Sequence, residues 1–575
     1  MNSPMAPAAP ARRGLALIGA LIMLGGGLLA HLVQGAGGIR ILDVRFTGTG
    51  GTAMSALLFI PPNATPKTPA PGVLAVHGYF NSRETQGDFA IEFARRGYVV
   101  LALDQTGHGY SDPPAFANRF GGPDGLRYLR SLDFVDANNI GLEGHSMGGW
   151  TVGNAAAAFP NGYKALVLEG SSTGAPFAPE GTPEFPRNLA VVYAQYDEFS
   201  PIMWGVPTAR EITESRKLRT LFGTQNAVEP GRTYGSIQNG TARVLYTPGG
   251  THPWNHISKS AIGHALEWFQ RTLVGGTPRP ADDQVWQWKE FGTSLAFVGF
   301  VILLLGLFDT LVRLPYFAAL LFAPASAETP RDARWWVTLL VGALLPAITL
   351  LPFFQLGSLI LPASHLLPQA VTNEIIVWAL LNAVIVAALS LLPGGRRLRF
   401  IRGGFWRAAL LAAMTFAASY AAVALLYGFF QVDLRYWFMA LKPMSTRQFT
   451  IFLTYLIPFA VFFLVALRAL HGALAVPTRS VITQYVINIA ALTLGYAAFL
   501  VVQYGMLFST GHIVSFFMTD ALRTIVAINF VPLMIIVGLI TTFALRRTGS
   551  YVAGAFLCAA LISWYVVVGQ ATQAA

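Results

Sequence analysis

The sequence predicts two kinds of structure in one chain: an α/β domain with a mostly parallel sheet covered by helices on both faces, and an all-α part that crosses a membrane several times. Between about Ile39 and Thr272, short apolar strands alternate with helical segments, which is typical of a parallel sheet. After about Pro280 the chain is apolar to its end. Of the 575 residues, 54% are hydrophobic and 12% charged, a balance that indicates membrane segments.

The basic excess of the sequence, a net charge of +11, lies mostly in arginines between apolar runs. It therefore indicates membrane topology, and we expect no nucleic-acid partner. The sequence has one cysteine, Cys558, which excludes an intrachain disulfide or a cysteine metal site. His252 and His256 lie four residues apart, but no His-Glu-x-x-His pattern supplies further ligands, so we expect no metal and no cofactor.

The N-terminal region, residues 1–36, contains an apolar run from Leu15 to Val33 that is about long enough to span a bilayer. Arg12 and Arg13 precede it, so the N-terminus is expected in the cytoplasm and the following domain outside. A cleaved signal peptide is the alternative, because Gly35-Ala36-Gly37 is a run of small residues. Both interpretations place the next domain outside the cytoplasm.

The α/β domain is expected to cover residues 37–280 and to begin with a hairpin. Helices are expected over Phe89 to Arg96, Asp124 to Val135 and Trp150 to Phe159. The strands are expected at Ile41 to Phe46 and Thr52 to Ile60 in the hairpin, then at Pro71 to Val76, Tyr98 to Leu103, around Ile140 and Leu142, Ala165 to Glu169, Leu189 to Ala194 and Arg243 to Tyr246.

Residues 281–575 are expected to form a membrane domain of about eight helices, a multi-pass arrangement suited to the cell membrane. The expected spans are 291–312, 335–356, 374–392, 405–430, 449–467, 481–507, 523–545 and 551–569. With the N-terminus inside, the loops expected in the cytoplasm hold Arg313, Arg331, Arg334, Arg396, Arg397, Arg399, Arg402, Arg407, Arg468, Arg479, Arg546 and Arg547, and the outer loops only Arg435, Lys442 and Arg447, with Arg523 at a span edge. This asymmetry supports nine spans and an outer C-terminus. Leu314 to Phe322 and Leu359 to Leu367 are short enough to be interfacial or re-entrant.

The motif around Ser146 organises the α/β domain. Gly144 and Gly148 flank Ser146 at minus two and plus two, between a strand and a helix-prone segment. A serine on such a sharp turn has a strained backbone, and the strand and helix pack so closely that only small residues fit at the flanking positions.

These residues resemble the α/β-hydrolase family over about Ile39 to Thr272, and the resemblance does not extend to the C-terminal spans. The family has the order nucleophile, acid, histidine, each just after a strand, and Ser146, Asp197 and His252 follow that order here. The resemblance implies that His252 takes the serine proton, that Asp197 orients His252, and that the backbone N–H groups of Tyr79 and Met147 bind the oxyanion.

Several alternatives remain open for the site. Glu169 also ends a strand and is a second candidate for the acid, and Glu198 adjoins Asp197. His256 is a second candidate for the base and is otherwise a loop residue. We expect His145 and His108 to be structural, His77 to orient the oxyanion loop, and Ser82 and Arg83 to line the entrance.

The expected function is a membrane-embedded serine hydrolase that cleaves carboxylic esters, with lipid or amphiphilic acyl compounds as candidate substrates, through an acyl-enzyme. A transporter or receptor that uses the domain to bind ligand, and a membrane acyltransferase, are the alternatives. The spans contain no row of carboxylates typical of a proton-driven transporter. We expect Asp309 and Arg313 to pair at a helix end and Asn382, Asn488 and Asn529 to form interhelical hydrogen bonds.

Overall fold

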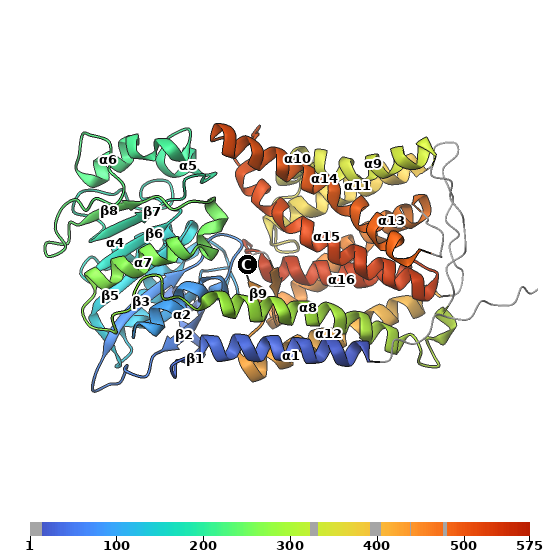
Figure 1. The fold of residues 1–575 in the computed structure, drawn as a ribbon, viewed down its shortest axis with the longest axis horizontal. Coiled ribbons are helices and arrows are strands. Elements are labelled where there is room, and N and C mark those ends of the chain that lie inside the picture. The colour runs from blue at the N-terminus through green and yellow to red at the C-terminus, as the bar shows by residue number, and fades with distance from the viewer. Residues whose placement is uncertain (1–13, 322–331, 391–403, 437–438, 475–479, 575) are drawn as a thin grey trace, which may run out of the picture.

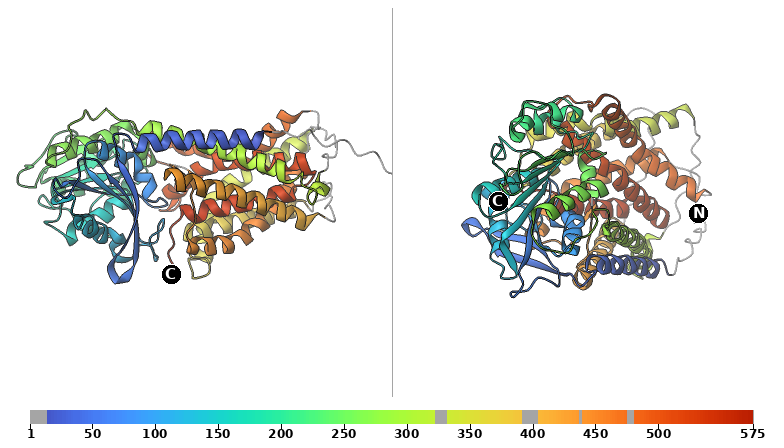
Figure 2. Two further views of the ribbon diagram at one scale, coloured as in Figure 1. Left: turned by 90° about the horizontal axis from the view of Figure 1, so that it is seen from below. Right: turned by 60° about the vertical axis from the view of Figure 1, so that its left-hand side comes forward.

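The computed structural model describes residues 14–321, 332–390, 404–436, 439–474 and 480–574. A sheet-containing part and a bundle of long helices lie end to end, and the C-terminus lies where they meet (Figure 1). The two views of Figure 2 show the same arrangement, with helix α1 (Leu15–Gln34) running along the bundle toward the sheet.

The sheet has eight strands in the order β1-β2-β4-β3-β5-β6-β7-β8. The hairpin strands β1 and β2, and the pair β2 and β4, are antiparallel, whereas the remaining neighbours are parallel. The prediction of an N-terminal hairpin leading into a mostly parallel sheet is therefore confirmed. The strands are β1 Arg40–Thr47, β2 Ala53–Ile60, β3 Ala70–Val76, β4 Val99–Asp104, β5 Val135–His145, β6 Ala165–Glu169, β7 Leu189–Val192 and β8 Arg243–Tyr246.

Helices cover both faces of this sheet, and each face has its own apolar core. Helices α2 (Gly87–Arg95) and α7 (Lys259–Thr272) pack on one face, where Phe89, Phe93 and Phe269 are buried. Helices α3 (Gly122–Arg130) and α4 (Met147–Ala158) pack on the other, with α5 (Ser200–Trp204) and α6 (Arg216–Phe222) at its edge. Burial on both faces explains why the central strands read as continuous apolar runs.

Some predicted boundaries are wrong. The helix expected from Asp124 to Val135 ends at Arg130, because Val135 already begins β5 and pairs with Ala70 of β3. Helix α4 starts at Met147, directly after the serine, and not at Trp150.

The C-terminal part is helical, and each expected span overlaps one helix or one bent pair. Eight helices of the described residues are long and apolar enough to cross a membrane, and a bent pair raises the number to as many as nine. The pair occupies the stretch expected as 335–356 and bends by 48° at Thr349, within the turn that precedes Pro352, which has no N–H to bond to the carbonyl of Ile348. Besides α1, these helices are α8 Trp286–Leu311, the bent pair α9 Ala333–Ile348 and α10 Leu350–Ile360, α11 Ala370–Ser390, α12 Phe405–Phe430, α13 Thr446–Ala473, α14 Val481–Thr510, α15 Asp520–Thr548 and α16 Val552–Gly569.

Helix α1 packs closely on α8 through glycines. A Cβ atom added to Gly26 would lie 2.4 Å from the backbone nitrogen of Ala296, and one added to Gly299 would lie 2.3 Å from that of Met23. Larger side chains would push the two backbones apart, as expected for helices that associate through small residues in lipid. Helix α1 is thus an integral member of the helical bundle.

The polar contacts expected at a helix end and between helices form in part. Asp309 accepts from Arg313 at 3.3 Å, as expected, and also from Arg547 at 2.9 Å. Asn382 donates to Thr349 at 3.0 Å and Asn488 to Thr542 at 2.9 Å. Asn529 differs, because its side chain lines a cavity described below. Of the arginines used to predict topology, Arg331, Arg396, Arg397, Arg399, Arg402 and Arg479 lie outside the described residues.

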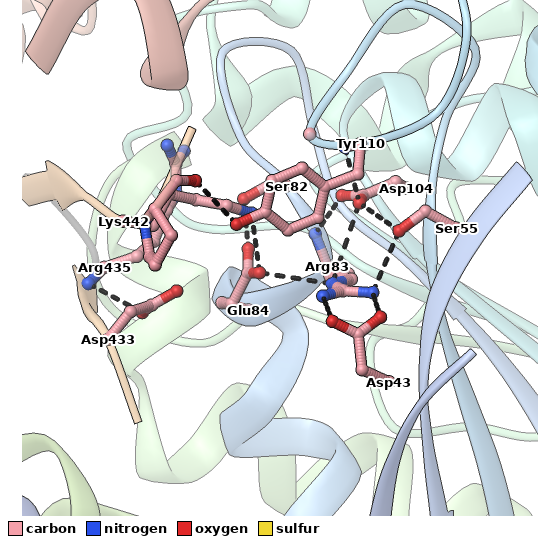
Figure 3. Close-up of polar contacts among 12 residues, drawn as sticks. Asp43, Ser55, Ser82, Arg83, Glu84, Asp104, Tyr110, Asp433, Arg435 and Lys442 are labelled. Carbon is pink, nitrogen blue, oxygen red and sulfur yellow. Dashed lines mark hydrogen bonds and ion pairs between the residues drawn. The ribbon is translucent and has the colours of Figure 1, made fainter. Parts of the chain in front are cut away.

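A buried polar layer joins the sheet to the helical bundle (Figure 3). Arg83 binds both carboxylate oxygens of Asp43, at 2.6 and 2.7 Å, and donates to the hydroxyl of Tyr427 on α12 at 3.1 Å. Lys442, which follows the short strand β10 (Met439–Leu441), binds Glu84 at 2.6 Å. Loss of one member of a buried pair leaves an uncompensated charge, so this layer resists separation of the two parts.

Candidate active site

Ser146 lies on a strained turn between β5 and α4. Its backbone has φ 53° and ψ −121°, a region that non-glycine residues rarely occupy. A Cβ atom on Gly144 would lie 2.3 Å from the carbonyl oxygen of Gly148, and one on Gly148 would lie 2.1 Å from that of Val76. The glycines are therefore required by close backbone contacts, as the motif predicts, and they hold the serine at the carboxyl end of the central strands.

Asp197 and His252 come together from the ends of the next strands. His252 Nδ1 lies 2.8 Å from Asp197 Oδ2. Asp197 Oδ1 accepts from the Tyr193 hydroxyl at 3.1 Å and from the backbone N–H of Phe199 at 2.9 Å. These contacts fix the carboxylate, and the carboxylate in turn fixes the orientation and tautomer of the imidazole.

Ser146 and His252 line the same cavity, whose volume is about 100 Å³. No hydrogen bond links Ser146 Oγ to His252 among the recorded contacts of the described residues. Such contacts are often long in the absence of substrate and shorten in the reactive complex.

The loop after β3 carries the expected oxyanion donor Tyr79 and adjoins the serine. A Cβ atom on Gly78 would lie 3.1 Å from Ser146 Cβ, so the loop passes directly beside the nucleophile candidate. His77 Nδ1 lies 2.7 Å from the carbonyl oxygen of Gly78, and His77 Nε2 accepts from the backbone N–H of Gln105 at 3.2 Å. Met147, the other expected donor, is the first residue of α4, where an N–H has no partner within the helix.

The alternative acids differ in their contacts with His252. Both carboxylate oxygens of Glu169 are buried without a hydrogen-bond partner in the described residues, so Glu169 does not orient the imidazole. Burial, with the neighbouring Glu143, raises the pKa of Glu169 well above its usual range. Glu198 accepts from the backbone N–H of His252 at 2.8 Å and from Tyr504 of α14 at 3.0 Å, and it does not contact the ring nitrogens. Of these three carboxylates, that of Asp197 is the one in contact with Nδ1.

The pKa values separate the two histidine candidates. Burial opposes the charged form of His252, but the adjacent Asp197 carboxylate outweighs it and raises the pKa of His252 above 6.5. Burial and the nearby His252 lower the pKa of His256 to about 3. A base for neutral pH needs a pKa near the working pH, which favours His252. The expectation that His256 is a loop residue is wrong, because it is buried in a short 3-10 helix with its ring 3.9 Å from that of His145.

The other histidines expected to be structural make local contacts. His145 Nε2 lies 3.1 Å from the carbonyl oxygen of His252, and His108 Nδ1 lies 3.0 Å from that of Thr106. The expectation that Ser82 and Arg83 line the entrance is wrong. Both are fully buried in the polar layer, where Asp43 and Asp104, distant in the sequence, draw Arg83 away from the cavity.

The helical bundle forms much of the cavity wall, which the sequence did not indicate. Helix α15 contributes Leu522, Ile525 and Val526 together with Asn529, and Arg435 lies on the short strand β9 (Leu434–Tyr436). The tail after α16 also reaches the oxyanion loop, where Gln573 donates to the Tyr79 hydroxyl at 2.7 Å. The candidate site is thus shared by the sheet domain and the bundle.

The described residues contain no group of three or more His, Cys, Asp or Glu side chains that could hold a metal ion.

Comparison with known proteins identifies the sheet domain. Residues 71–226 match the family model described as alpha/beta hydrolase fold. With the observed strand order, this match shows that the chain contains an α/β-hydrolase domain.

Curated relatives match only parts of the chain. A monoacylglycerol lipase of Mycolicibacterium smegmatis is 32% identical over 144 residues, which are 23% of this chain and 46% of the lipase. A 2-hydroxy-6-oxononadienedioate/2-hydroxy-6-oxononatrienedioate hydrolase of Cupriavidus pinatubonensis is 38% identical over 88 residues, 15% of this chain and 30% of that protein. An uncharacterised Mycobacterium tuberculosis protein is 32% identical over 105 residues, 17% of this chain and 28% of its own length. The chain thus spans less than half of each of these relatives.

Solved structures give distant matches. An esterase of Pyrobaculum calidifontis is 15% identical with a TM-score of 0.29, over 47% of this chain and all of the esterase (100%). A dienelactone hydrolase of Anabaena variabilis is 17% identical with a TM-score of 0.27, over 41% of this chain and 99% of that enzyme.

Proposed function

We propose that the protein is a membrane-embedded serine hydrolase that cleaves carboxylic esters of amphiphilic substrates. The observation that carries this proposal is the cavity lined by both Ser146, on its strained turn, and His252, whose Nδ1 lies 2.8 Å from Asp197 Oδ2. The α/β-hydrolase fold and the lipase and hydrolase relatives support the same class of reaction.

In the proposed reaction, Ser146 Oγ attacks the ester carbonyl carbon while its proton passes to His252 Nε2. The N–H groups of Tyr79 and Met147 stabilise the oxyanion. The bond to the alcohol then breaks, and His252 gives its proton to the leaving oxygen. Water, deprotonated by His252, then attacks the acyl carbon. As the bond between that carbon and Ser146 Oγ breaks, His252 returns the proton to Oγ, and the carboxylic acid and free Ser146 are released.

The walls of the cavity support an amphiphilic substrate. The apolar side chains of α15 face the same space as Ser146, and α15 is one of the helices long and apolar enough to cross a membrane. A soluble ester gains little from such a wall, whereas each buried CH₂ of an acyl chain gains about 0.8 kcal/mol. The monoacylglycerol lipase among the relatives acts, by its name, on a substrate of this kind.

The proposal is tested with the full chain in a neutral detergent and a series of 4-nitrophenyl esters from acetate to dodecanoate. We expect Ser146-dependent hydrolysis whose kcat/KM rises with chain length. If the folded protein hydrolyses neither any of these esters nor a monoacylglycerol, the proposal is contradicted.

The pH dependence follows from the pKa of His252. The base must be neutral, and Asp197 raises the pKa of its conjugate acid above 6.5. We therefore expect kcat/KM to fall as the pH drops, with an apparent pKa above that of an ordinary histidine. Asp197→Asn should move this pKa downward, because the neutral amide no longer stabilises the imidazolium. If kcat/KM instead fell only near pH 3, the base would be a group such as His256.

We propose further that α1 is retained as an anchor and that the hydrolase domain lies outside the cytoplasm, as the arginine distribution predicts. The loop from Pro61 to Pro71 contains the exposed Lys67. Trypsin added to intact cells or right-side-out vesicles should cut there, and Lys67→Gln should abolish that cut. Protection of the loop, with cleavage within residues 394–402, would invert the orientation.

A further inference from the structure

We infer that the cavity contains an anion-binding subsite formed by Arg435, so that the ester substrate carries a carboxylate or phosphate group. This inference rests on the proposed hydrolase function and names the class of its substrate. Arg435 comes from β9, in the connection between α12 and α13, and lines the same cavity as Ser146 and His252.

The guanidinium of Arg435 is buried but only partly used. The residue is 3% exposed, and its Nε and Nη1 atoms have no hydrogen-bond partner in the described part of the chain. Its Nη2 atom donates to the carbonyl oxygen of Phe80 at 2.7 Å and to Asn81 Oδ1 at 3.2 Å. Arginine has five N–H donors, and a buried donor without an acceptor is unfavourable, so the unpartnered Nε and Nη1 favour an acceptor from a ligand.

Two nearby carboxylates do not pair with the Arg435 side chain. Glu84 binds Lys442 at 2.6 Å and Arg83 at 3.2 Å. Asp433 Oδ1 accepts from the backbone N–H of Arg435 at 2.9 Å, whereas its Oδ2 has no hydrogen-bond partner in the described residues. Burial raises the pKa of this carboxyl group to about 7. No carboxylate of the described residues forms an ion pair with the Arg435 side chain. The Nε–H lies on the Nη2 side of the guanidinium, away from Nη1, so Nε and Nη1 each offer a separate charge-assisted hydrogen bond to a carboxylate or phosphate oxygen.

The position of Arg435 allows one substrate to reach both groups. Phe80 and Asn81, which bind Nη2, directly follow the expected oxyanion donor Tyr79. Because Arg435 and Ser146 line one cavity, an anionic group that accepts from Nε or Nη1 can belong to the substrate that reaches Ser146, while the apolar residues of α15 contact the remainder of that substrate. An anion shielded from water by this wall is bound more strongly than one at an exposed arginine.

The contacts to Phe80 and Asn81 also give Arg435 a positioning role, which would affect every ester alike. A test must therefore compare matched anionic and neutral substrates. The first pair, mono-4-nitrophenyl glutarate and 4-nitrophenyl hexanoate, differs by a carboxylate on the acyl side. The second pair, 1-oleoyl lysophosphatidic acid and 1-oleoylglycerol, differs by a phosphate on the alcohol side.

We expect the wild-type chain to prefer the anionic member of at least one pair. In Arg435→Gln the ratio of kcat/KM for anionic over neutral substrate should fall about tenfold or more, as for loss of charged hydrogen bonds. The pair that responds identifies the side of the ester that carries the charge. Asn81→Ala should lower kcat/KM for the anionic and the neutral member of a pair together. Arg447→Gln, which removes a half-exposed arginine paired with Asp112, should leave the ratio unchanged.

The subsite would be overturned if the wild type preferred the neutral member of both pairs. It would also be overturned if the ratio of kcat/KM for anionic over neutral substrate were equal in wild type and Arg435→Gln.

Binding is measured independently of catalysis in Ser146→Ala protein. Oleate should raise its melting temperature more than oleyl alcohol does, and Arg435→Gln should remove that difference. Failure of ester hydrolysis with the oleate effect intact would refute the hydrolase and keep the subsite. Ester hydrolysis that is unaffected by Arg435→Gln would refute the subsite and keep the hydrolase.

Discussion

Ser146→Ala should reduce the kcat for a medium-chain 4-nitrophenyl ester by a factor on the order of 10⁶, to the background of the assay. The substitution removes one hydroxyl from a turn whose shape is set by the close contacts of Gly144 and Gly148. The fold should therefore be retained, with the melting temperature and the elution volume in detergent close to those of the wild type.

Ser146→Cys provides a matched control, because it keeps a nucleophile of similar size on the same turn. Residual activity in the cysteine variant and none in the alanine variant would identify the side chain at 146 as the attacking group. Full activity in well-folded Ser146→Ala protein would exclude the serine from the reaction.

His252→Ala should cost several orders of magnitude in kcat/KM, because Ser146 then has no group to take its proton. Asp197→Asn should cost about 10⁴-fold, since the amide permits the wrong tautomer of His252. The contact at 2.8 Å between His252 Nδ1 and Asp197 Oδ2 is the basis of both expectations.

His256→Ala tests the alternative histidine. His256 is buried, and neither of its ring nitrogens has a hydrogen-bond partner in the described residues. Its loss should lower the melting temperature through the cavity created beside His145, with a much smaller effect on kcat/KM. A larger kinetic loss in His256→Ala than in His252→Ala would reverse the assignment.

The local pattern around Ser146 could be predicted because its causes are local. The glycines at 144 and 148 are required wherever a strand, a tight turn and a helix approach this closely, so the sequence indicates the geometry directly. The order Ser146, Asp197, His252 could likewise be proposed from the strands that precede each residue. Their roles in catalysis stay predictions.

Contacts between residues distant in the sequence could not be predicted. Arg83 was expected at the entrance, but Asp43 and Tyr427 bind it in the polar layer. Asn529 was expected to bond to another helix and instead lines the cavity. The sequence around Arg435 indicates only membrane topology, because nothing in this segment shows that Arg435 reaches the loop after β3.

The most direct test of the account is covalent labelling of the full chain with a fluorophosphonate, followed by mass mapping of the adduct. If Ser146 is the nucleophile, one adduct should form, on the peptide that contains Ser146, and it should be absent in Ser146→Ala. Labelling should be strongly slowed in His252→Ala, because the serine is then no longer activated. A folded wild-type protein that is not labelled, or an adduct on another residue that persists in Ser146→Ala, would contradict the assignment of Ser146 as the nucleophile.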